Sequence, residues 1–214
     1  MTEKLRKPYN PQEDNDILDI YNQNGIPIGT CDRKTVHDNG LWHYAMHCWL
    51  YTEIDNTRYV IFQKRQIDKR IFPNKLDVAA AGHYIAGEKF EDGLRELIEE
   101  LNINPSDIEV SFYKTEQFSY EDSYIKNNEF WNIYICHFTF KGYDFAFDES
   151  EVQDVLFLPL NQTLELMQSK GKGFMLGFSA KEKKTVKIVF EDFVTPYKDY
   201  FLSLLEVIKM RGVK

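Results

Sequence analysis

The chain has 214 residues, of which 43% are hydrophobic and 15% aromatic, and its 34 acidic and 26 basic residues give a formal net charge of −8. This composition is typical of a globular protein and excludes a disordered or fibrous chain. The acidic charge argues against a nucleic-acid polymer as partner, and no apolar run reaches the roughly 18 residues of a membrane span.

In chain order, the residue patterns predict a mixed α+β fold, because strands outnumber helices and do not alternate strictly with them. A polar arm comes first, and a hairpin over residues 17–29 follows it, with its turn at Asn24-Gly25. Aromatic and β-branched stretches then predict strands, and apolar periodicity predicts helices. The predicted strands are residues 43–52, 58–64, 76–81, 108–117, 130–140 and 152–158, and the predicted helices are residues 90–101, 161–169 and 196–210.

The lysine-rich stretch 170–184 has no apolar periodicity and predicts a loop. We therefore expect a polar arm over residues 1–15 and one domain over residues 16–160. A helical extension over residues 161–214 is expected to pack on that domain.

Three widely separated cysteines, Cys31, Cys48 and Cys136, form no CxxC pair, which excludes the spacing of a zinc ribbon. Their odd number, with a charged N-terminus that lacks the apolar core of a signal peptide, predicts a reducing, cytoplasmic location.

The predicted helix at residues 90–101 carries the most chemical information. At ~100° per residue, three carboxylates, Glu96, Glu99 and Glu100, cluster on one face. The apolar residues form a stripe on the opposite face, made of Leu94, Leu97, Ile98 and Leu101. Like charges this close destabilise a helix, and Mg²⁺ prefers carboxylate oxygens, so the pattern favours a cation site. A solvated acidic face would give the same periodicity.

Residues 82–103 resemble the Nudix box, in which a glycine, five residues, a glutamate and seven residues precede Arg-Glu-aliphatic-any-Glu-Glu-any-Gly-aliphatic. The matching positions are Gly82, Glu88, Arg95, Glu96, Leu97, Glu99, Glu100 and Ile103. Two positions depart from the pattern. Only six residues, 89–94, separate Glu88 from Arg95, and Asn102 replaces the second glycine. Asparagine tolerates the left-handed conformation that ends a helix, whereas the missing residue shortens the loop before it.

This resemblance implies the Nudix fold, an α/β arrangement with a mixed sheet sandwiched between helices, and a hydrolase that cleaves a diphosphate linkage. It implies Mg²⁺ or Mn²⁺ as cofactor and a small-molecule diphosphate as substrate, with no membrane or nucleic-acid partner, and it is compatible with a homodimer. By the match, Glu96, Glu99 and Glu100, with Glu88, are metal ligands, and Arg95 orients them. One glutamate would take the proton from the attacking water.

Residues upstream resemble the branch that includes type 1 isopentenyl-diphosphate isomerases, through His37, His43, a cationic segment over 63–69, and the sequence AAAGH before the box. In the isomerases, three histidines and two glutamates hold a metal. The resemblance therefore implies a second metal site at His37, His43 and His83, with Glu129 as a ligand or general base. Asn127 stands at the other glutamate position. Ordinary strand-end histidines are the alternative.

Arg65 and Lys69 match basic residues that grip the diphosphate in the isomerases, and with Gly82 they form the implied substrate contacts. A solvated basic loop is the alternative. The aromatic side chains that could contact the organic group on the diphosphate are Phe118, Tyr120, Tyr124 and Trp131.

Isomerisation in this branch needs a cysteine directly before the Gly-His pair, and here that residue is Ala81. A methyl group can neither donate nor accept a proton, so we expect hydrolysis. An isomerase-like enzyme and a catalytically silent nucleotide-binding domain are the alternatives.

Overall fold

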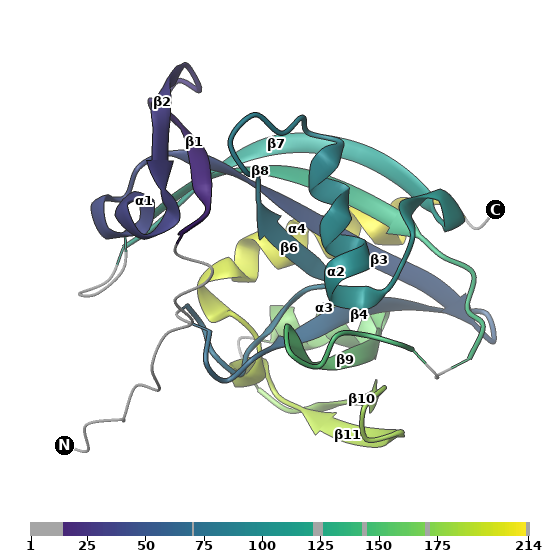
Figure 1. Cartoon of the computed structure of the whole chain (residues 1–214). Coiled ribbons are helices and arrows are strands. Elements are labelled where there is room, and N and C mark those ends of the chain that lie inside the picture. Colours follow the sequence, from purple (N-terminus) through teal and green to yellow (C-terminus); the bar gives the residue numbers. More distant parts are fainter. Residues whose placement is uncertain (1–14, 70, 122–125, 143–144, 170–171, 213–214) are drawn as a thin grey trace.

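The computed structural model describes residues 15–69, 71–121, 126–142, 145–169 and 172–212, so the predicted arm over 1–15 and Tyr124 lie essentially outside the described residues. Within this part, the chain forms a large sheet, a separate N-terminal hairpin and four α-helices (Figure 1). The strands are β1 (Ile17–Tyr21), β2 (Pro27–Asp32), β3 (His43–Ile54), β4 (Thr57–Arg65), β5 (Leu76–Val78), β6 (Ala80–His83), β7 (Glu109–Glu121), β8 (Lys126–His137), β9 (Val152–Pro159), β10 (Met175–Ser179) and β11 (Lys184–Ile188). The helices are α1 (Arg33–Asn39), α2 (Glu96–Leu101), α3 (Leu160–Gln168) and α4 (Lys198–Met210), with the 3₁₀ helices η2 (Asp92–Arg95), η3 (Pro105–Asp107), η4 (Phe190–Asp192) and η5 (Thr195–Tyr197).

In the described residues the large sheet has the order β11-β10-β9-β4-β3-β8-β7, and β5 and β6 pair with β4 and β3 respectively. Strands β3 and β8 run parallel and the other pairs are antiparallel, which confirms the predicted mixed sheet. The hairpin β1–β2 is also confirmed, and Gly25 takes a positive φ of 74° in its turn.

Helices cover both faces of the sheet. Helix α4 packs Phe201 and Leu204 on one face, against Trp49 and Phe62. Helix α2 packs Leu97 and Leu101 on the other face, and Figure 1 shows the two helices on opposite sides of the strands. Burying side chains of this size contributes roughly 1.5–3 kcal/mol each, so the sandwich holds both helices in place around the site.

The expected loop over 170–184 is wrong in part, because residues 175–179 and 184–188 form strands that extend the sheet. Met175, Gly177 and Ser179 are the buried positions of β10. Lys181 and Lys183 lie in the turn between the two strands, where Lys183 has a φ of 51°. The C-terminal helix is confirmed as α4. The domain limits 16–160 and 161–214 stay a prediction.

Two further elements differ from expectation. The predicted helix over 90–101 is a 3₁₀ turn, η2, followed by the short α2, and Asn102 ends it in the left-handed conformation with φ 52°. Helix α1 was not predicted. Asp32 caps its first turn by accepting a hydrogen bond from the Thr35 amide, and Gly40 ends it with φ 63°.

No helix among the described residues has the length and apolarity that a membrane crossing requires.

Candidate active site

The predicted site residues meet where β3 and β4 separate. The two strands pair over residues 50–54 and 57–61, and beyond this point β6 pairs with β3 and β5 with β4. A cavity of about 750 Å³ is lined by residues of all four strands. The lining includes the predicted site residues His37, Arg65, Lys69, Gly82, His83, Glu88, Arg95, Glu96, Glu99, Glu100 and Glu129.

Arg95 lies at the centre of a group of acidic side chains. We call Arg95 and these side chains the box cluster, which consists of Glu88, Arg95, Glu96, Glu99 and Glu100. Its Nε donates to Glu88 Oε1 at 2.9 Å. Its Nη1 donates to Glu99 Oε2 at 3.2 Å and to a Glu96 oxygen. One guanidinium therefore fixes three carboxylates of the cluster through charge-assisted hydrogen bonds.

Arg95 is also anchored to the backbone, because its Nη2 donates to the carbonyl oxygen of His83 at 2.9 Å. Glu88 is anchored by the amide of Ile85, which donates to its Oε2 at 2.7 Å. The shortened loop thus still brings Glu88 to the guanidinium, with the tight turn of η2 replacing a longer entry to the helix.

Gly82 makes room for Glu96. A Cβ at position 82 would lie 2.0 Å from Glu96 Oε1, far inside contact distance. The glycine therefore lets the Glu96 carboxylate lie directly against the backbone of β6.

Glu100, which the periodicity put on the face opposite the apolar stripe, is buried. Its residue is 6% exposed, and its Oε2 accepts hydrogen bonds from Gln63 Nε2 at 3.1 Å and from the Ala81 amide at 3.2 Å. Ile98, which the periodicity put on the buried stripe, is 48% exposed instead. The short helix is thus turned about its axis, relative to the predicted orientation, so that the Glu100 carboxylate contacts β4 and β6.

Two carboxylates of the box cluster, Glu96 and Glu100, lie in a poorly solvated place. Burial raises the pKa of Glu96, although Arg95 opposes the rise. Burial and the charge of Glu96 raise the pKa of Glu100 well above its usual range. A divalent cation bound by these oxygens would remove the repulsion, and an all-oxygen donor set suits Mg²⁺ or Mn²⁺.

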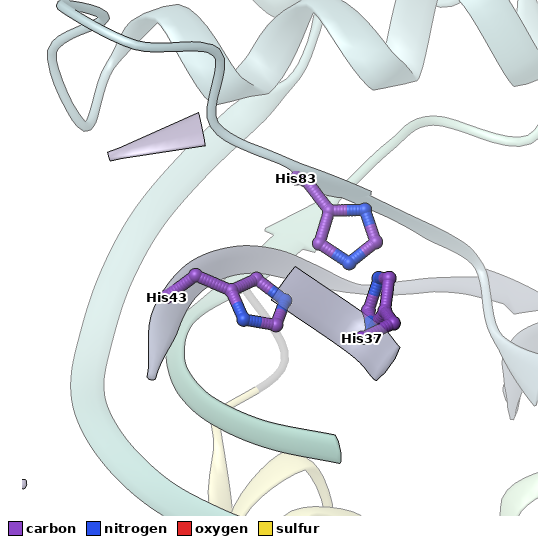
Figure 2. A group of neighbouring side chains, drawn as sticks. All are labelled: His37, His43 and His83. Carbon is purple, nitrogen blue, oxygen red and sulfur yellow. The ribbon is translucent and has the colours of Figure 1, made fainter. Parts of the chain in front are cut away.

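Three histidines form a second group, which we call the histidine cluster. His37 comes from α1, His43 from the start of β3 and His83 from the end of β6, and Figure 2 shows their rings turned toward one another. One ligand nitrogen from each lies within 4.8 Å of those of the other two. The ring centroids are 5.0 Å apart in each pair.

Hydrogen bonds determine which ring nitrogen carries the proton in His43 and in His83. Nδ1 of His43 lies 2.9 Å from the carbonyl oxygen of Leu41, which can only accept, so Nδ1 carries the proton and Nε2 the lone pair. Nε2 of His83 lies 3.2 Å from Glu129 Oε1 and donates to it. This leaves His43 Nε2, His83 Nδ1 and His37 Nδ1 buried without a hydrogen-bond partner among the described residues.

The cluster fits a metal ion, because each imidazole brings one nitrogen within 4.8 Å of those of the other two. Burial, followed by the neighbouring imidazoles, lowers the pKa of His37 to about 2. Burial, followed by the charge of Arg33, lowers the pKa of His83 to about 3. Neutral imidazoles are the form that binds a transition metal.

Glu129 links the histidine cluster to the sheet. Its Oε1 lies 3.4 Å from His43 Nε2, and its Oε2 accepts from Trp131 Nε1 at 2.6 Å. Asn127 precedes it by two residues on the same strand and is also buried in the cavity lining, with Oδ1 unpaired among the described residues. Ala81 also lines the cavity and presents only a methyl group.

The predicted cationic residues also line the cavity, and each is held by an acid. Arg65 Nη1 donates to Asp77 Oδ2 at 2.9 Å, and its Nε donates to the Ile71 carbonyl oxygen at 3.1 Å. Lys69 Nζ donates to Glu151 Oε2 at 2.9 Å. Both side chains therefore face the cavity and are oriented, rather than extended into solvent.

Several cavity residues escaped the sequence analysis: Arg33, His47, Asp77, Glu151 and Tyr197. The sequence could have indicated Arg33, because it precedes His37 by four residues. Residues at this spacing lie on the same face of a helix, here α1. The others come together only through strand pairing and the return of the C-terminal segment.

This chain is similar to known proteins in sequence and in fold. A family model described as the NUDIX domain matches residues 42–177. An uncharacterized Nudix hydrolase of Clostridium acetobutylicum is 32% identical over 194 residues, which cover 86% of this chain and 91% of that protein. An isopentenyl-diphosphate Delta-isomerase of Aliivibrio fischeri is 34% identical over 85 residues, which cover 39% of this chain and 47% of the isomerase.

Among solved structures, the crystal structure of DR0079 from Deinococcus radiodurans has a TM-score of 0.57 at 21% identity, and the match covers 72% of this chain and 90% of that one. This likeness concerns the fold.

Proposed function

This chain belongs to the Nudix hydrolase family, and we propose that it hydrolyses the diphosphate linkage of a small organic diphosphate with the help of Mg²⁺ or Mn²⁺. The observation that carries the proposal is the box cluster, in which one arginine binds three carboxylates at the wall of a cavity that Arg65 and Lys69 also line.

In the proposed reaction a water molecule attacks one phosphorus of the diphosphate, the bridging P–O bond breaks, and the departing phosphate group keeps the electron pair. A divalent cation held by Glu96, Glu99 and Glu100 would spread the diphosphate charge and activate water. Arg65 and Lys69 would grip the phosphate oxygens, the first as a planar fork and the second as a point charge.

The proton of the attacking water needs a carboxylate within reach. Glu99 has a half-exposed side chain and Glu100 a buried one. Both face the same cavity, which Glu129 also lines. Each is a proposed general base, and Arg95 is proposed to hold the box carboxylates in the productive orientation.

The histidine cluster is proposed as a second metal site, on the strength of three imidazoles whose ligand nitrogens lie within 4.8 Å of one another. An imidazole donor set favours zinc or a similar transition metal over Mg²⁺. The observations that support this second metal site do not involve the box cluster.

Isomerisation of a prenyl diphosphate is the second candidate, favoured by the histidine cluster and by the partial match to an isomerase. Ala81 and Asn127 count against it, because neither can move a proton. A silent nucleotide-binding domain is opposed by the intact box carboxylates. A cytoplasmic location and a homodimer stay predictions.

The test is phosphate or pyrophosphate release from a panel of diphosphates, namely nucleotides, nucleotide sugars, thiamine diphosphate and prenyl diphosphates, with Mg²⁺, Mn²⁺ or chelator. Metal-dependent release from any member supports hydrolysis. Absence of release, with a ligand that raises the melting temperature, would favour the binding domain instead.

A further inference from the structure

One buried histidine at the cavity belongs to neither cluster. His47 points to the same side of β3 as His43, because residues two apart on a strand share a face, and it lies about 13 Å along the strand from it. Its cross-strand partner is Ala81, and both residues line the cavity. His47 is 5% exposed and stacks on Trp131, with ring centroids 4.3 Å apart.

The tautomer of His47 follows from its neighbours. The hydroxyl of Tyr200 accepts a hydrogen bond from Trp49 Nε1 at 2.8 Å and lies 3.0 Å from His47 Nδ1. The tyrosine proton is satisfied only if it is donated to His47 Nδ1, so Nδ1 is the acceptor and Nε2 carries the hydrogen. Burial lowers the pKa of His47, so the ring stays neutral.

Nε2 of His47 is therefore a fixed N–H donor with no partner among the described residues. Tyr197 adds a second donor. Its ring contacts Trp131 edge-on at 5.0 Å and Phe72 at 5.4 Å, and it lines the cavity at 6% exposure. Its hydroxyl makes no hydrogen bond within the described part of the chain, and burial raises the pKa of this phenol, so it keeps its proton.

We infer that His47 and Tyr197 determine specificity, by donating hydrogen bonds to the organic group on the diphosphate, and that this group carries hydroxyl or carbonyl oxygens rather than a hydrocarbon chain. The inference rests on the proposed function for the position of the diphosphate. It goes further by naming the chemistry of the other half of the substrate.

The physical reason is the cost of leaving buried donors unpaired. A prenyl chain would displace water from both donors and offer them nothing, whereas a sugar or similar hydroxylated group would satisfy them. The Trp49–Tyr200–His47 chain of hydrogen bonds holds the imidazole donor in place before any ligand binds.

The test compares the binding of two probes, ADP-ribose and isopentenyl diphosphate, by calorimetry with Mg²⁺ in the Glu99→Gln background. Binding there can be measured even if the proposed hydrolysis is wrong, so the two failures are distinguishable. Tyr197→Phe removes only the hydroxyl, and His47→Phe removes the donor while keeping a ring on Trp131. The matched controls are Tyr113→Phe and His137→Phe, whose side chains lie outside the cavity lining.

We expect ADP-ribose to bind more tightly than isopentenyl diphosphate, and each cavity variant to lower the ratio of the two affinities at least tenfold, with no change in the controls. An affinity ratio in the folded cavity variants that equals the wild-type ratio would overturn the inference. Tighter binding of isopentenyl diphosphate than of ADP-ribose would also overturn it.

Because His47→Phe disturbs a packed network, the wild-type protein gives an independent measurement. The ¹⁵N resonance of His47 Nε2 should shift when ADP-ribose is added and keep its position with isopentenyl diphosphate. If ADP-ribose does not bind, UDP-glucose takes its place, and failure of both hydroxylated probes to bind also counts against the inference.

Discussion

The box cluster and the histidine cluster are both groups of metal-ligating side chains at one cavity, but they are built in opposite ways. The box cluster comes from one short segment, and its own arginine balances part of its charge. The histidine cluster comes from three separate elements, and its rings offer lone pairs that nothing in the described protein meets. The first is therefore organised by its own arginine, whereas the second is a group of neutral imidazoles that a bound metal would join.

The largest effect is expected from a change in Arg95, the residue that holds the carboxylates of the box cluster together. Arg95→Lys keeps the charge but loses the planar fork that binds three carboxylates, so we expect diphosphate hydrolysis to fall roughly 10²- to 10³-fold. Initial rates at saturating Mg²⁺ measure it. Arg211→Lys, at the far end of α4, is the matched control. An active Arg95→Lys enzyme would mean that the fork is not needed.

Removing one ligand of the histidine cluster should affect metal content rather than the box cluster. We expect His83→Ala to weaken zinc binding by roughly 10- to 100-fold, a loss of the size seen when metal sites are disturbed. Metal analysis after dialysis measures it, with His137→Ala as control. Unchanged zinc binding would show that the three nitrogens do not form a site.

Filling the space beside Glu96 tests the packing of the box cluster. Gly82→Ala puts a methyl group 2.0 Å from Glu96 Oε1, so the carboxylate must move. We expect a loss of roughly 1–3 kcal/mol in the free energy of unfolding, together with reduced activity. Thermal unfolding measures the first, and Gly212→Ala, where a Cβ meets nothing within 4 Å, should be neutral. An equally stable and active Gly82→Ala protein would refute the close packing.

The smallest effect concerns pH in the metal-free protein. His37 has a folded pKa of about 2 against an ordinary value of 6.5. Above pH 6.5 the ring is neutral in both states. Below it, the unfolded chain binds a proton that the folded chain does not, so the free energy of unfolding falls as pH falls, by up to about 1.4 kcal/mol per pH unit.

The difference between wild type and His37→Asn isolates this effect, because buried carboxylates titrate in both proteins. Denaturant unfolding between pH 7 and 4 should show the wild type losing stability faster. Parallel pH profiles would mean that His37 is not buried in its neutral form.

The contrast also explains what the sequence could predict. The box is local, so its spacing predicted the carboxylates, the arginine and the left-handed Asn102. The periodicity misplaced Glu100 and Ile98 because a helix of six residues is oriented by its tertiary contacts, here Gln63 and the Ala81 amide. The strands over 175–188 were missed because lysines dominate the turn between them.

Long-range features were the least predictable. Asp77, Glu151 and Tyr197 reach the cavity through strand pairing or the return of the chain, and no local pattern marks them. His47 looked like an ordinary strand residue, since only the Tyr200 hydroxyl, 153 positions away, fixes its proton.

The central claim is that the box carboxylates carry a Mg²⁺- or Mn²⁺-dependent hydrolysis. The most direct measurement is phosphate release by wild type and Glu99→Gln across a Mg²⁺ titration, with Glu165→Gln on the surface of α3 as control. The account predicts that Glu99→Gln loses at least about 100-fold in rate at every Mg²⁺ concentration, while its melting temperature matches the wild type. Wild-type rates in Glu99→Gln, or full activity in chelator, would contradict it.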